Sequence, residues 1–199
     1  MLQWPNSVSE LSVHPHCEEE RAGLYHAFDG GSAEVEVLEF LEALVRLLKP
    51  RAVLLTGLEQ GYCALALASG LRSNGFGRLH AVEPNQQVAQ GAAGRLADFR
   101  GFYLLHHCDS LQFLEAHDGP PFELCVFDGP LGRRADEYNH CERYGLLAHE
   151  AVCVFHDTSE LRGQGHDPAF VRFVAGLRDC HPGGLTCRYS RGLTMIQRR

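Results

Sequence analysis

The sequence contains a single lysine, Lys49, and its 18 Lys and Arg residues are outnumbered by 25 Asp and Glu residues. The formal net charge is therefore -7 at pH 7. Binding to a phosphate backbone needs clustered Lys and Arg side chains. This charge balance argues against a general nucleic-acid-binding protein, and we expect no nucleic-acid partner.

Long apolar runs and paired cysteines are also missing. No window reaches the roughly 18–20 apolar residues that a membrane-spanning helix needs. The first twenty residues have no basic stretch followed by an apolar run, so we expect no secretory signal. The eight cysteines occur singly, without a CxxC pair, and several lie in apolar segments such as LCVF and VCVF. This usage predicts no disulfide framework, no membrane contact and a reducing, cytoplasmic location.

The segment from Arg51 to Glu83 has the pattern of a strand, a glycine-containing turn, a helix and a second strand. The turn leaves unpaired backbone N–H groups at the start of the helix. An acid at the tip of the next parallel strand, here Glu83, lies beside that turn and can accept hydrogen bonds from two ribose hydroxyls. The pattern predicts a nucleoside-containing ligand. The four predicted elements are Ala52–Leu55, Thr56–Gly61, Tyr62–Leu71 and Leu79–Val82.

The rest of the chain repeats this alternation. Apolar strands that alternate with helices indicate a parallel sheet with helices on both faces, and two C-terminal strands around a turn at Ser190–Arg191 add an antiparallel hairpin. The predicted fold is α/β: a Rossmann-like, doubly wound, mostly parallel seven-stranded sheet. Further strands are expected at 102–107, 123–127 and 151–155, and further helices at 32–48, 85–98, 111–117, 136–144 and 168–180.

The chain before this domain has little periodicity. Residues 1–31 are expected to form an irregular or partly helical N-terminal cap or lid, and residues 32–199 the main domain. Ser32 is predicted to cap the first helix. Its sheet-facing side is predicted to carry Val37, Leu41, Leu44, Val45 and Leu48, and its other side Glu34, Glu39, Glu42 and Arg46. The run from His14 to Cys17 has metal-ligand residue types but lacks a second ligand pair, so we interpret it as surface.

Polar residues recur where the predicted strands end. Ligands of open α/β sheets bind outside the carboxyl ends of the strands, which meet at one edge. A single Asp after a strand is usually a turn residue or helix cap, but five successive strands with polar ends indicate a shared site. These residues are Gly57 and Gly61, Glu83, Asp109 and Ser110, Asp128, and His156 with Asp157.

At these positions the chain resembles class I S-adenosylmethionine-dependent methyltransferases, in particular the small bacterial group similar to macrocin and cephalosporin-pathway O-methyltransferases. The similarity spans about Ser32 to Gln197. The family's glycine motif, E-x-G-x-x-x-G-[YF]-S, corresponds to Leu55–Cys63, with Leu55 in place of the acid and Cys63 in place of the serine. The other matches are Glu83 in HAVEPN, Asp109–Ser110, Phe127-Asp128-Gly129 and Phe155-His156-Asp157.

The resemblance implies S-adenosylmethionine as cofactor and a role for each matched residue. Gly57 and Gly61 would let the backbone approach the methionine part, Glu83 would hold the ribose hydroxyls, and Asp109 with Ser110 would frame the adenine. The implied cofactor-binding residues are Thr56, Gly57, Gly61, Tyr62, Glu83, Pro84, Asp109, Ser110 and Asp128.

Three residues at the far end of this site are the candidate catalytic residues: Asp128, His156 and Asp157. A hydroxyl acceptor must lose its proton, either to a general base or after a divalent cation has lowered its pKa. Asp128 and Asp157 on neighbouring strand tips suit Mg²⁺ or another hard ion, and the resemblance also implies a metal there. His156 as a base oriented by either Asp is the competing arrangement. A third option is that His156 and Asp157 only stabilise loops.

The predicted activity is transfer of a methyl group to a hydroxyl, or alternatively an amine, of a small-molecule acceptor. Arg133, Arg134, Tyr138 and His140 could line the acceptor pocket, and two adjacent arginines would suit an anionic acceptor. The alternative for this segment is a solvated helix start. A non-catalytic methyltransferase-fold protein that binds the cofactor or a partner is the alternative. A nicotinamide-dependent oxidoreductase fits less well, because it would need G-x-G-x-x-G after the first strand. Relatives that pair through N-terminal segments leave a homodimer as an option.

Overall fold

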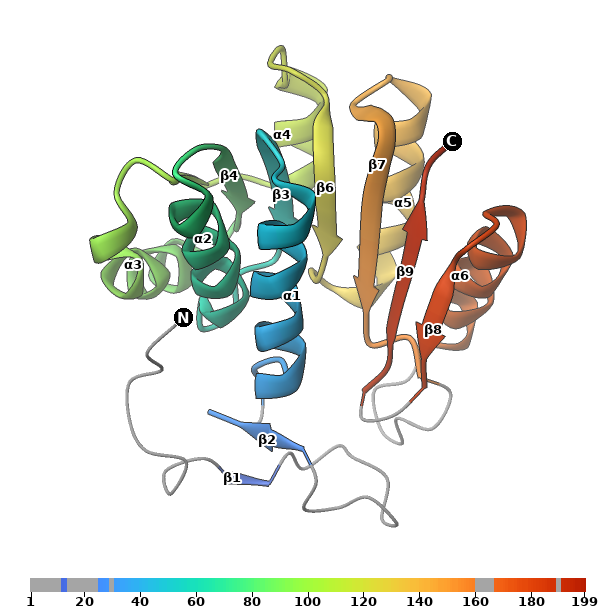
Figure 1. The fold of residues 1–199 in the computed structure, drawn as a ribbon, viewed down its shortest axis with the longest axis horizontal. Coiled ribbons are helices and arrows are strands. Elements are labelled where there is room, and N and C mark those ends of the chain that lie inside the picture. Colours follow the sequence, from blue (N-terminus) through green and yellow to red (C-terminus); the bar gives the residue numbers. More distant parts are fainter. Residues whose placement is uncertain (1–11, 14–24, 29–30, 160–166, 189–190) are drawn as a thin grey trace.

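The computed structural model of the 199-residue chain describes residues 12–13, 25–28, 31–159, 167–188 and 191–199. The predicted sheet is confirmed: seven strands lie in the order β5-β4-β3-β6-β7-β9-β8. Figure 1 shows β4, β3, β6, β7, β9 and β8 from left to right. The five strands that pair in parallel are β3 (Ala52–Thr56), β4 (Arg78–Val82), β5 (Tyr103–His106), β6 (Phe122–Phe127) and β7 (Leu147–His156).

The C-terminal hairpin extends this sheet in the antiparallel sense, as predicted. Strand β9 (Leu193–Gln197) pairs with β7, and its first residue, Leu193, lies opposite His156 at the end of β7. Strand β8 (Leu185–Cys187) then pairs with β9 and forms the edge. Because β9 runs against β7, the residues just before β9 lie beside those just after β7. This register brings the C-terminal turn to the carboxyl edge of the parallel strands.

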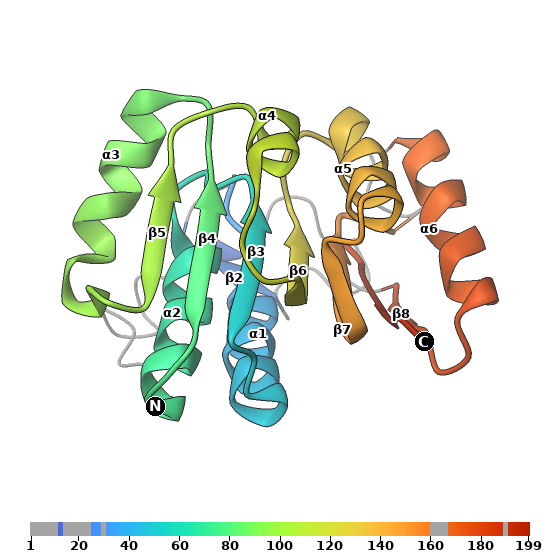
Figure 2. The ribbon, with the colours of Figure 1, turned by 90° about the horizontal axis from the view of Figure 1, so that it is seen from above.

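Helices cover both faces of the sheet, which explains why the central strands are apolar throughout. Helices α1 and α2 lie on one side of the sheet, and α4 and α5 on the other (Figures 1 and 2). The core between the sheet and helices α1 and α2, called the first core, contains Val53 and Leu55 of β3. The core on the opposite face, with α4 and α5, is called the second core and contains Ala52 and Leu54. The helices are α1 (Val35–Leu48), α2 (Tyr62–Asn74), α3 (Gln86–Arg95), α4 (Ser110–Ala116), α5 (Leu131–Arg143) and α6 (Pro168–Cys180), with a 3₁₀ turn η3 (Ala97–Phe99).

The start of α1 corrects one prediction. The helix begins at Val35, and Glu34, not Ser32, is the residue at its N-terminus, with an extended backbone and no side-chain cap. Ser32 is buried one turn earlier, where its carbonyl accepts a hydrogen bond from Arg191. The predicted polar side of the helix is also partly wrong, because Glu34 and Glu42 are buried. Glu42 accepts a hydrogen bond from Ser69 of α2, and Glu34 belongs to the site described below.

Helix α5 begins at Leu131, five residues before its predicted start at 136. Its buried positions are Arg134, Glu137, Tyr138 and Cys141, which follow helical spacing. Because two of these four side chains are charged, the first turn carries no apolar signal in the sequence. The predicted start at 136 is therefore wrong, because buried charged positions have the same sequence pattern as a solvated helix start.

The described part of the N-terminal segment is a short antiparallel pair and not a helix. Strand β1 (Ser12–Val13) pairs with β2 (His26–Ala27). Figure 1 shows this pair at the end of the sheet toward which β6 and β7 point. His26 fixes it to α1, since its backbone N–H and its ring nitrogen both contact Glu36. The run His14–Cys17 and the loop with Gly163 and Gly165 lie outside the described residues.

Within the described ranges, no helix is both long enough and apolar enough to cross a bilayer.

Candidate active site

A pocket of about 510 Å³ opens at the carboxyl ends of β3, β4, β6 and β7. This volume lies within the roughly 300–1,000 Å³ of small-molecule and cofactor sites. Of the predicted strand-end residues, the lining includes Gly57, Glu83, Asp109, Ser110, Asp128 and Asp157. Gly61 and His156 do not line it, and His156 contacts Asp128. The glycine, charged and amide or hydroxyl residues of the wall are Gly31, Ser32, Gly57, Glu59, Gln60, Glu83, Asn85, Asp109, Ser110, Asp128, Gly129, Arg133, Arg134, Glu137, Asp157 and Arg191, together with Tyr62.

The turn between β3 and α2 depends on two glycines with positive φ. At Gly57 (φ +82°) an added Cβ would lie 2.6 Å from the Cα of Gly129, so only glycine lets β3 and β6 approach here. At Gly61 (φ +83°) an added Cβ would lie 2.8 Å from the Cβ of Ala92 in α3. Glycine adopts these conformations without the steric penalty of a side chain. The glycines thus shape the floor of the pocket through main-chain packing.

Glu83 closes the turn from the tip of β4. Its carboxylate accepts hydrogen bonds from the backbone N–H groups of Leu58 (3.2 Å) and Asn85 (2.9 Å). Asn85 in turn caps α3 by accepting from the N–H groups of Gln87 and Val88. A carboxylate oxygen can accept more than one hydrogen bond. Glu83 can therefore hold the turn and still accept from a ligand hydroxyl in the pocket.

Asp109 and Ser110 follow β5 and line the pocket, but both also contact protein groups. Asp109 caps α4 by accepting from the N–H of Leu111, and its other oxygen pairs with Arg133. Burial acts to raise the pKa of Asp109, but the hydrogen bonds from Arg133 and Leu111 outweigh burial and lower it. Asp109 is therefore held ionised at the rim.

Glu137 is a buried carboxylate that the sequence did not single out. It accepts hydrogen bonds from the hydroxyls of Thr56 (2.7 Å) and Ser110. Burial raises its pKa above the ordinary value. Glu137 thus connects α5 to the ends of β3 and β5 under the pocket floor.

His156 lies between two carboxylates. Its Nδ1 is 3.0 Å from Oδ1 of Asp128, and its Nε2 is 2.8 Å from Oε2 of Glu34, whose side chain is fully buried. Asp128 also accepts a hydrogen bond from the thiol of Cys63, with Sγ 3.2 Å from Oδ2. The result is a continuous chain of contacts from the start of α1 to the pocket wall.

Burial alone would lower the pKa of His156, but the carboxylates of Asp157, Glu34 and Asp128 outweigh burial and raise this pKa to about 10. The imidazole is therefore a cation at neutral pH. For Asp128, burial acts to raise the pKa, whereas His156 and Arg134 lower it below its ordinary value. A protonated His156 donates hydrogen bonds to both neighbours and has no lone pair with which to accept a proton. These contacts favour a positioning role for His156 over the predicted role of a base.

Asp157 follows His156 and is held by two arginines. Its Oδ2 lies 3.0 Å from Nη2 of Arg134 and 3.1 Å from Nη2 of Arg191, and its Oδ1 lies 2.6 Å from Nε of Arg191. Asp157 also has a left-handed backbone (φ +61°), an unfavourable conformation for a residue with a side chain. Such strained positions persist only where the surroundings fix them. Here the two ion pairs supply that constraint.

Arg134 and Arg191 each join several segments. Arg134 donates to the carbonyls of Gly129 and His156, both at 2.6 Å. Arg191 donates from its side chain to the carbonyls of Gly31 and Ser32, and its backbone N–H donates to Glu34 at 2.8 Å. Arg191 therefore links the N-terminal segment, the end of β7 and the C-terminal hairpin.

The metal prediction needs free oxygens on Asp128 and Asp157. With His156 they form a group whose candidate ligand atoms lie within 4.8 Å of one another. Both oxygens of Asp157, however, contact guanidinium groups, and the oxygens of Asp128 contact His156, Arg134 and Cys63. Hard divalent ions take anionic and neutral oxygen ligands, not a site that already contains three cations. The donor set as arranged does not fit such an ion.

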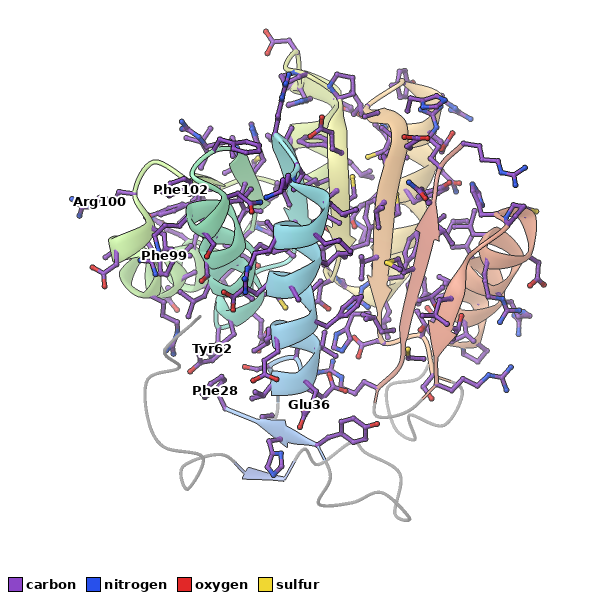
Figure 3. All side chains as sticks on the ribbon, viewed as in Figure 1. Phe28, Glu36, Tyr62, Phe99, Arg100 and Phe102 are labelled. Carbon is purple, nitrogen blue, oxygen red and sulfur yellow. The ribbon has the colours of Figure 1, made fainter. Side chains whose placement is uncertain are left out.

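Tyr62 connects the pocket to the N-terminal segment. Its ring stacks on Phe28, with ring centroids 4.3 Å apart, and the guanidinium of Arg95 lies 4.4 Å from the Tyr62 centroid. Figure 3 shows Phe28, just after β2, pointing toward Tyr62 at the start of α2. The segment before α1 is thus packed against one side of the pocket mouth.

Two residues predicted for an acceptor pocket lie elsewhere. Tyr138 is buried among Phe127, Phe155 and Phe173 in the second core. The ring of His140 packs on Tyr144, and neither residue lines the pocket. Both predictions were wrong, because Tyr138 lies on the face of α5 that packs into the second core and His140 packs on Tyr144 outside the pocket lining. Arg133 and Arg134 do line the pocket, but each is paired with an Asp.

Glu34 and Arg191 are the main site residues that the sequence analysis missed. A signal for Arg191 existed in the predicted topology, since the turn before an antiparallel strand must lie beside the end of the strand it pairs with. Glu34 gave no such signal, because an acid at the start of a helix is usually solvated there.

The fold and the pocket define a Rossmann-like α/β protein whose ligand binds at the carboxyl ends of the parallel strands. The sequence matches the methyltransferase-domain family over residues 54–158, and the chain belongs to this family. This membership confirms the resemblance to methyltransferases and their enzyme class. Comparison with curated proteins gave no significant match.

Several solved structures share the fold. An O-methyltransferase from Bacillus cereus, solved with SAH, superposes with a TM-score of 0.72 at 19% identity, covering 86% of this chain and 84% of that one. The O-methyltransferase TomG from Streptomyces achromogenes, involved in tomaymycin synthesis and solved with SAM, gives 0.68 at 21% identity, covering 84% and 82%. The SAH-bound methyltransferase PaMTH1 from Podospora anserina gives 0.70 at 18% identity, covering 85% and 80%.

Proposed function

We propose that this protein transfers a methyl group from S-adenosylmethionine to a hydroxyl of a small-molecule acceptor, with an amine as the alternative acceptor group. Family membership supports the reaction class, and the bound SAM and SAH of the structural neighbours support the cofactor. The observation that carries the proposal is Glu83 at the tip of β4, beside the glycine turn and inside the pocket. This is the position from which an acid holds a ribose.

The described residues fit the cofactor in size and chemistry. Gly57 and Gly61 let the turn pack against Gly129 and Ala92, and Glu83 and Asp109 place carboxyl oxygens at the rim of the pocket. In this proposal Glu83 accepts from the ribose hydroxyls, while Asp109 and Ser110 bound the adenine. Thr56, Tyr62 and Pro84 remain predicted cofactor contacts, of which Tyr62 and Pro84 line the pocket.

The acceptor is proposed to bind beside Asp128. Three acids contact His156 or Arg134: Glu34, Asp128 and Asp157. Asp128 is the most exposed of them, with 16% of its side chain exposed against 2% for Asp157. The bound cofactor supplies an electrophilic methyl group. Transfer would form the bond between the acceptor oxygen and the methyl carbon and break the bond between that carbon and the sulfonium sulfur, releasing S-adenosylhomocysteine. The proton of the acceptor oxygen would become strongly acidic as the new bond forms, so a carboxylate with a low pKa would suffice to accept it. Asp128 takes this proton and releases it to solvent, and His156 and Arg134 keep Asp128 ionised beforehand.

Two departures from the family motif, Leu55 and Cys63, support the alternative of a non-catalytic relative. Leu55 is fully buried in the first core, so it replaces the motif's acid with packing. Cys63 replaces the motif's serine, and its thiol donates a hydrogen bond to Asp128. Burial, followed by the charge of Asp128, raises the pKa of this thiol, so it remains a donor. Neither departure opens or blocks the pocket, and the catalytic reading is favoured.

Calorimetric titration of S-adenosylhomocysteine tests the cofactor site. We expect micromolar binding to the wild type and a loss of about 10–100-fold in Glu83→Ala, because a hydrogen bond to a charged group contributes about 1.5–3 kcal/mol. Glu115→Ala, an exposed acid on α4, is the matched control and should bind like the wild type. Absence of binding to the wild type would overturn the proposal.

A screen for acceptors tests the reaction itself. Release of S-adenosylhomocysteine from S-adenosylmethionine would be measured with panels of small hydroxyl and amine compounds, in wild type and Asp128→Asn. Turnover that depends on an acceptor and is lost in Asp128→Asn supports the proposed role of Asp128. Equal turnover in both proteins would remove Asp128 from the chemistry while leaving the cofactor site intact.

A further inference from the structure

The ion network around Asp157 contains three acids and three cations. The acids are Glu34, Asp128 and Asp157, and the cations are His156, Arg134 and Arg191. The side chains of Glu34, His156, Asp157 and Arg134 are almost completely buried, and Arg191 is nearly so. Buried charges persist in proteins when they are paired in this way. A network of equal charges has no electrostatic need for a further cation.

Arg191 contacts the same carboxylate oxygens of Asp157 that a divalent ion would need as ligands. Its Nη2 donates a hydrogen bond to Oδ2 of Asp157 at 3.1 Å, and its Nε forms an ion pair with Oδ1 at 2.6 Å, so both carboxylate oxygens face one guanidinium group. An Mg²⁺ ion would need the same oxygens at about 2.0–2.1 Å. In that position it would lie within a few ångströms of two guanidinium groups, where like charges in a buried site repel strongly.

Arg191 is also unable to move aside without other losses. Its Nη1 donates to the carbonyls of Gly31 and Ser32, and its backbone N–H donates to Glu34. The next residue, Gly192, has φ +86°, and a Cβ there would lie 2.2 Å from the backbone nitrogen of Ser159. Two backbone hydrogen bonds join the same segments, from Thr158 to Gly192 and from Ser159 to Arg191. The guanidinium is thus fixed by the main chain around it.

We infer that Arg191 occupies the role of a divalent cation in this site, so that Asp128 and Asp157 bind no metal and methyl transfer needs none. The statement that methyl transfer needs no metal rests on the proposed function. The statement that Asp128 and Asp157 bind no metal does not depend on it. Within this inference, Arg191 is a positioning residue that holds Asp157 and, through Glu34 and His156, the orientation of Asp128. The acceptor is then held by contact with one ionised acid and is not chelated. Acceptors with a single hydroxyl or amine satisfy this geometry.

Binding of Mn²⁺ tests the inference. Thermal unfolding of the wild type, with and without S-adenosylhomocysteine, would be recorded in EDTA and in 1 mM Mn²⁺, and free Mn²⁺ would be followed by its electron paramagnetic resonance signal. A site with a dissociation constant of 10 μM would raise Tm by roughly 5–10 °C under these conditions. We expect a shift below about 1 °C and an unchanged affinity for S-adenosylhomocysteine.

The variant Arg191→Gln removes one of the two competing guanidinium groups and frees Oδ1 of Asp157, while Oδ2 keeps its contact with Arg134. We expect it to gain Mn²⁺ binding of at least about tenfold over the wild type, corresponding to one removed repulsive contact. Arg188→Gln, an exposed arginine of the same hairpin, is the matched control and should gain nothing. A folded Arg191→Gln that binds Mn²⁺ no better than the wild type would overturn the role assigned to Arg191.

One-to-one binding of Mn²⁺ to the wild type, lost in Asp157→Asn, would overturn the inference directly. This wild-type titration decides the question even if Arg191→Gln does not fold. Failure of the proposed function has a different signature, because it would appear as absent binding of S-adenosylhomocysteine in the same samples, whatever Mn²⁺ does.

Discussion

The two halves of the pocket are built in different ways. In the cofactor half, Glu83 contacts the N–H groups of Leu58 and Asn85, which lie 25 and 2 residues away in the chain. In the acceptor half, Glu34 contacts His156 and Arg191, at separations of 122 and 157 residues. The first half uses main-chain groups of one βαβ unit, and the second uses buried ions from both ends of the domain. A local motif therefore defines the cofactor site, whereas tertiary structure defines the acceptor site.

This difference predicts different responses to substitution. A buried ion that loses a partner has no solvent to replace it, so the acceptor half should respond mainly through stability. The half-buried acids of the cofactor half can be rehydrated, so they should respond mainly through ligand affinity. Substitutions in the cofactor half should lower the free energy of unfolding as much as those in the acceptor half only where they strain the backbone.

Removal of a central acid should have the largest effect. Glu34→Ala deletes the partner of Nε2 of His156 and of the backbone N–H of Arg191, and leaves a buried imidazolium with one fewer anion. We expect the free energy of unfolding to fall by about 3–5 kcal/mol, measured by urea denaturation. Glu39→Ala, exposed on the same helix, should change it by less than about 0.5 kcal/mol. A loss below about 1 kcal/mol in Glu34→Ala would mean that the network is solvated.

The backbone of the cofactor half gives the next largest effect. Gly57→Ala forces a Cβ against the main chain of Gly129 at positive φ, so we expect a loss of about 2–3 kcal/mol together with weaker binding of S-adenosylhomocysteine. Gly91→Ala in α3 is the control, since a Cβ there meets nothing within 4 Å. It should be neutral or stabilising by about 0.5–1 kcal/mol. Equal behaviour of the two variants would contradict the close approach of β3 and β6.

The acceptor half should also give stability a dependence on alkaline pH. Folded His156 keeps its proton up to a pKa of about 10, whereas in the unfolded chain it loses it near 6.5. Its contribution is therefore complete below pH 6.5 and is lost as the pH rises toward 10. Between pH 7 and 8.5, the free energy of unfolding of the wild type should fall by up to about 1.4 kcal/mol per pH unit more than that of His156→Gln. Parallel pH profiles for the two proteins would show that His156 is neutral in the folded state.

The smallest effect is expected where the two halves meet, at Cys63. Cys63→Ser keeps a donor to Asp128, so stability and the affinity for S-adenosylhomocysteine should change by less than about 0.5 kcal/mol and twofold. Cys63→Val has a similar volume but no donor, and should lose about 1 kcal/mol of stability. If serine and valine behave alike, the thiol contributes packing and no hydrogen bond.

The sequence predicted the fold correctly where apolar residues recur at helix or strand spacing, or where polar residues mark the end of a strand. The order of strands and helices, the C-terminal hairpin and the bounds of α6 followed from such patterns. The start of α5 did not, because Arg134 and Glu137 are charged residues at buried positions. Arg134 can be buried because Asp157 pairs with it, and Glu137 because the hydroxyls of Thr56 and Ser110 donate to it. Only the folded chain brings these partners together.

The same distinction applies to the site. Glu83, Asp109 and Asp128 each terminate a strand, so topology alone brings them to one edge. The environment of Asp157 could not be predicted, since whether a carboxylate meets a metal or an arginine depends on a side chain from the C-terminal turn. The sequence therefore predicted which residues gather at the edge, but not which charges they face.

The contact between Arg191 and residues 31–34 has a consequence for how the domain opens. Because the same hydrogen bonds hold the start of α1 and the start of β9, neither can detach while the other stays in place. The first helix and the last strand then belong to one cooperative unfolding unit, although most of the chain lies between them. Native-state hydrogen exchange would show this as a common opening free energy for amides at both ends of the domain. Opening of the acceptor side of the pocket is thereby coupled to both ends of the domain.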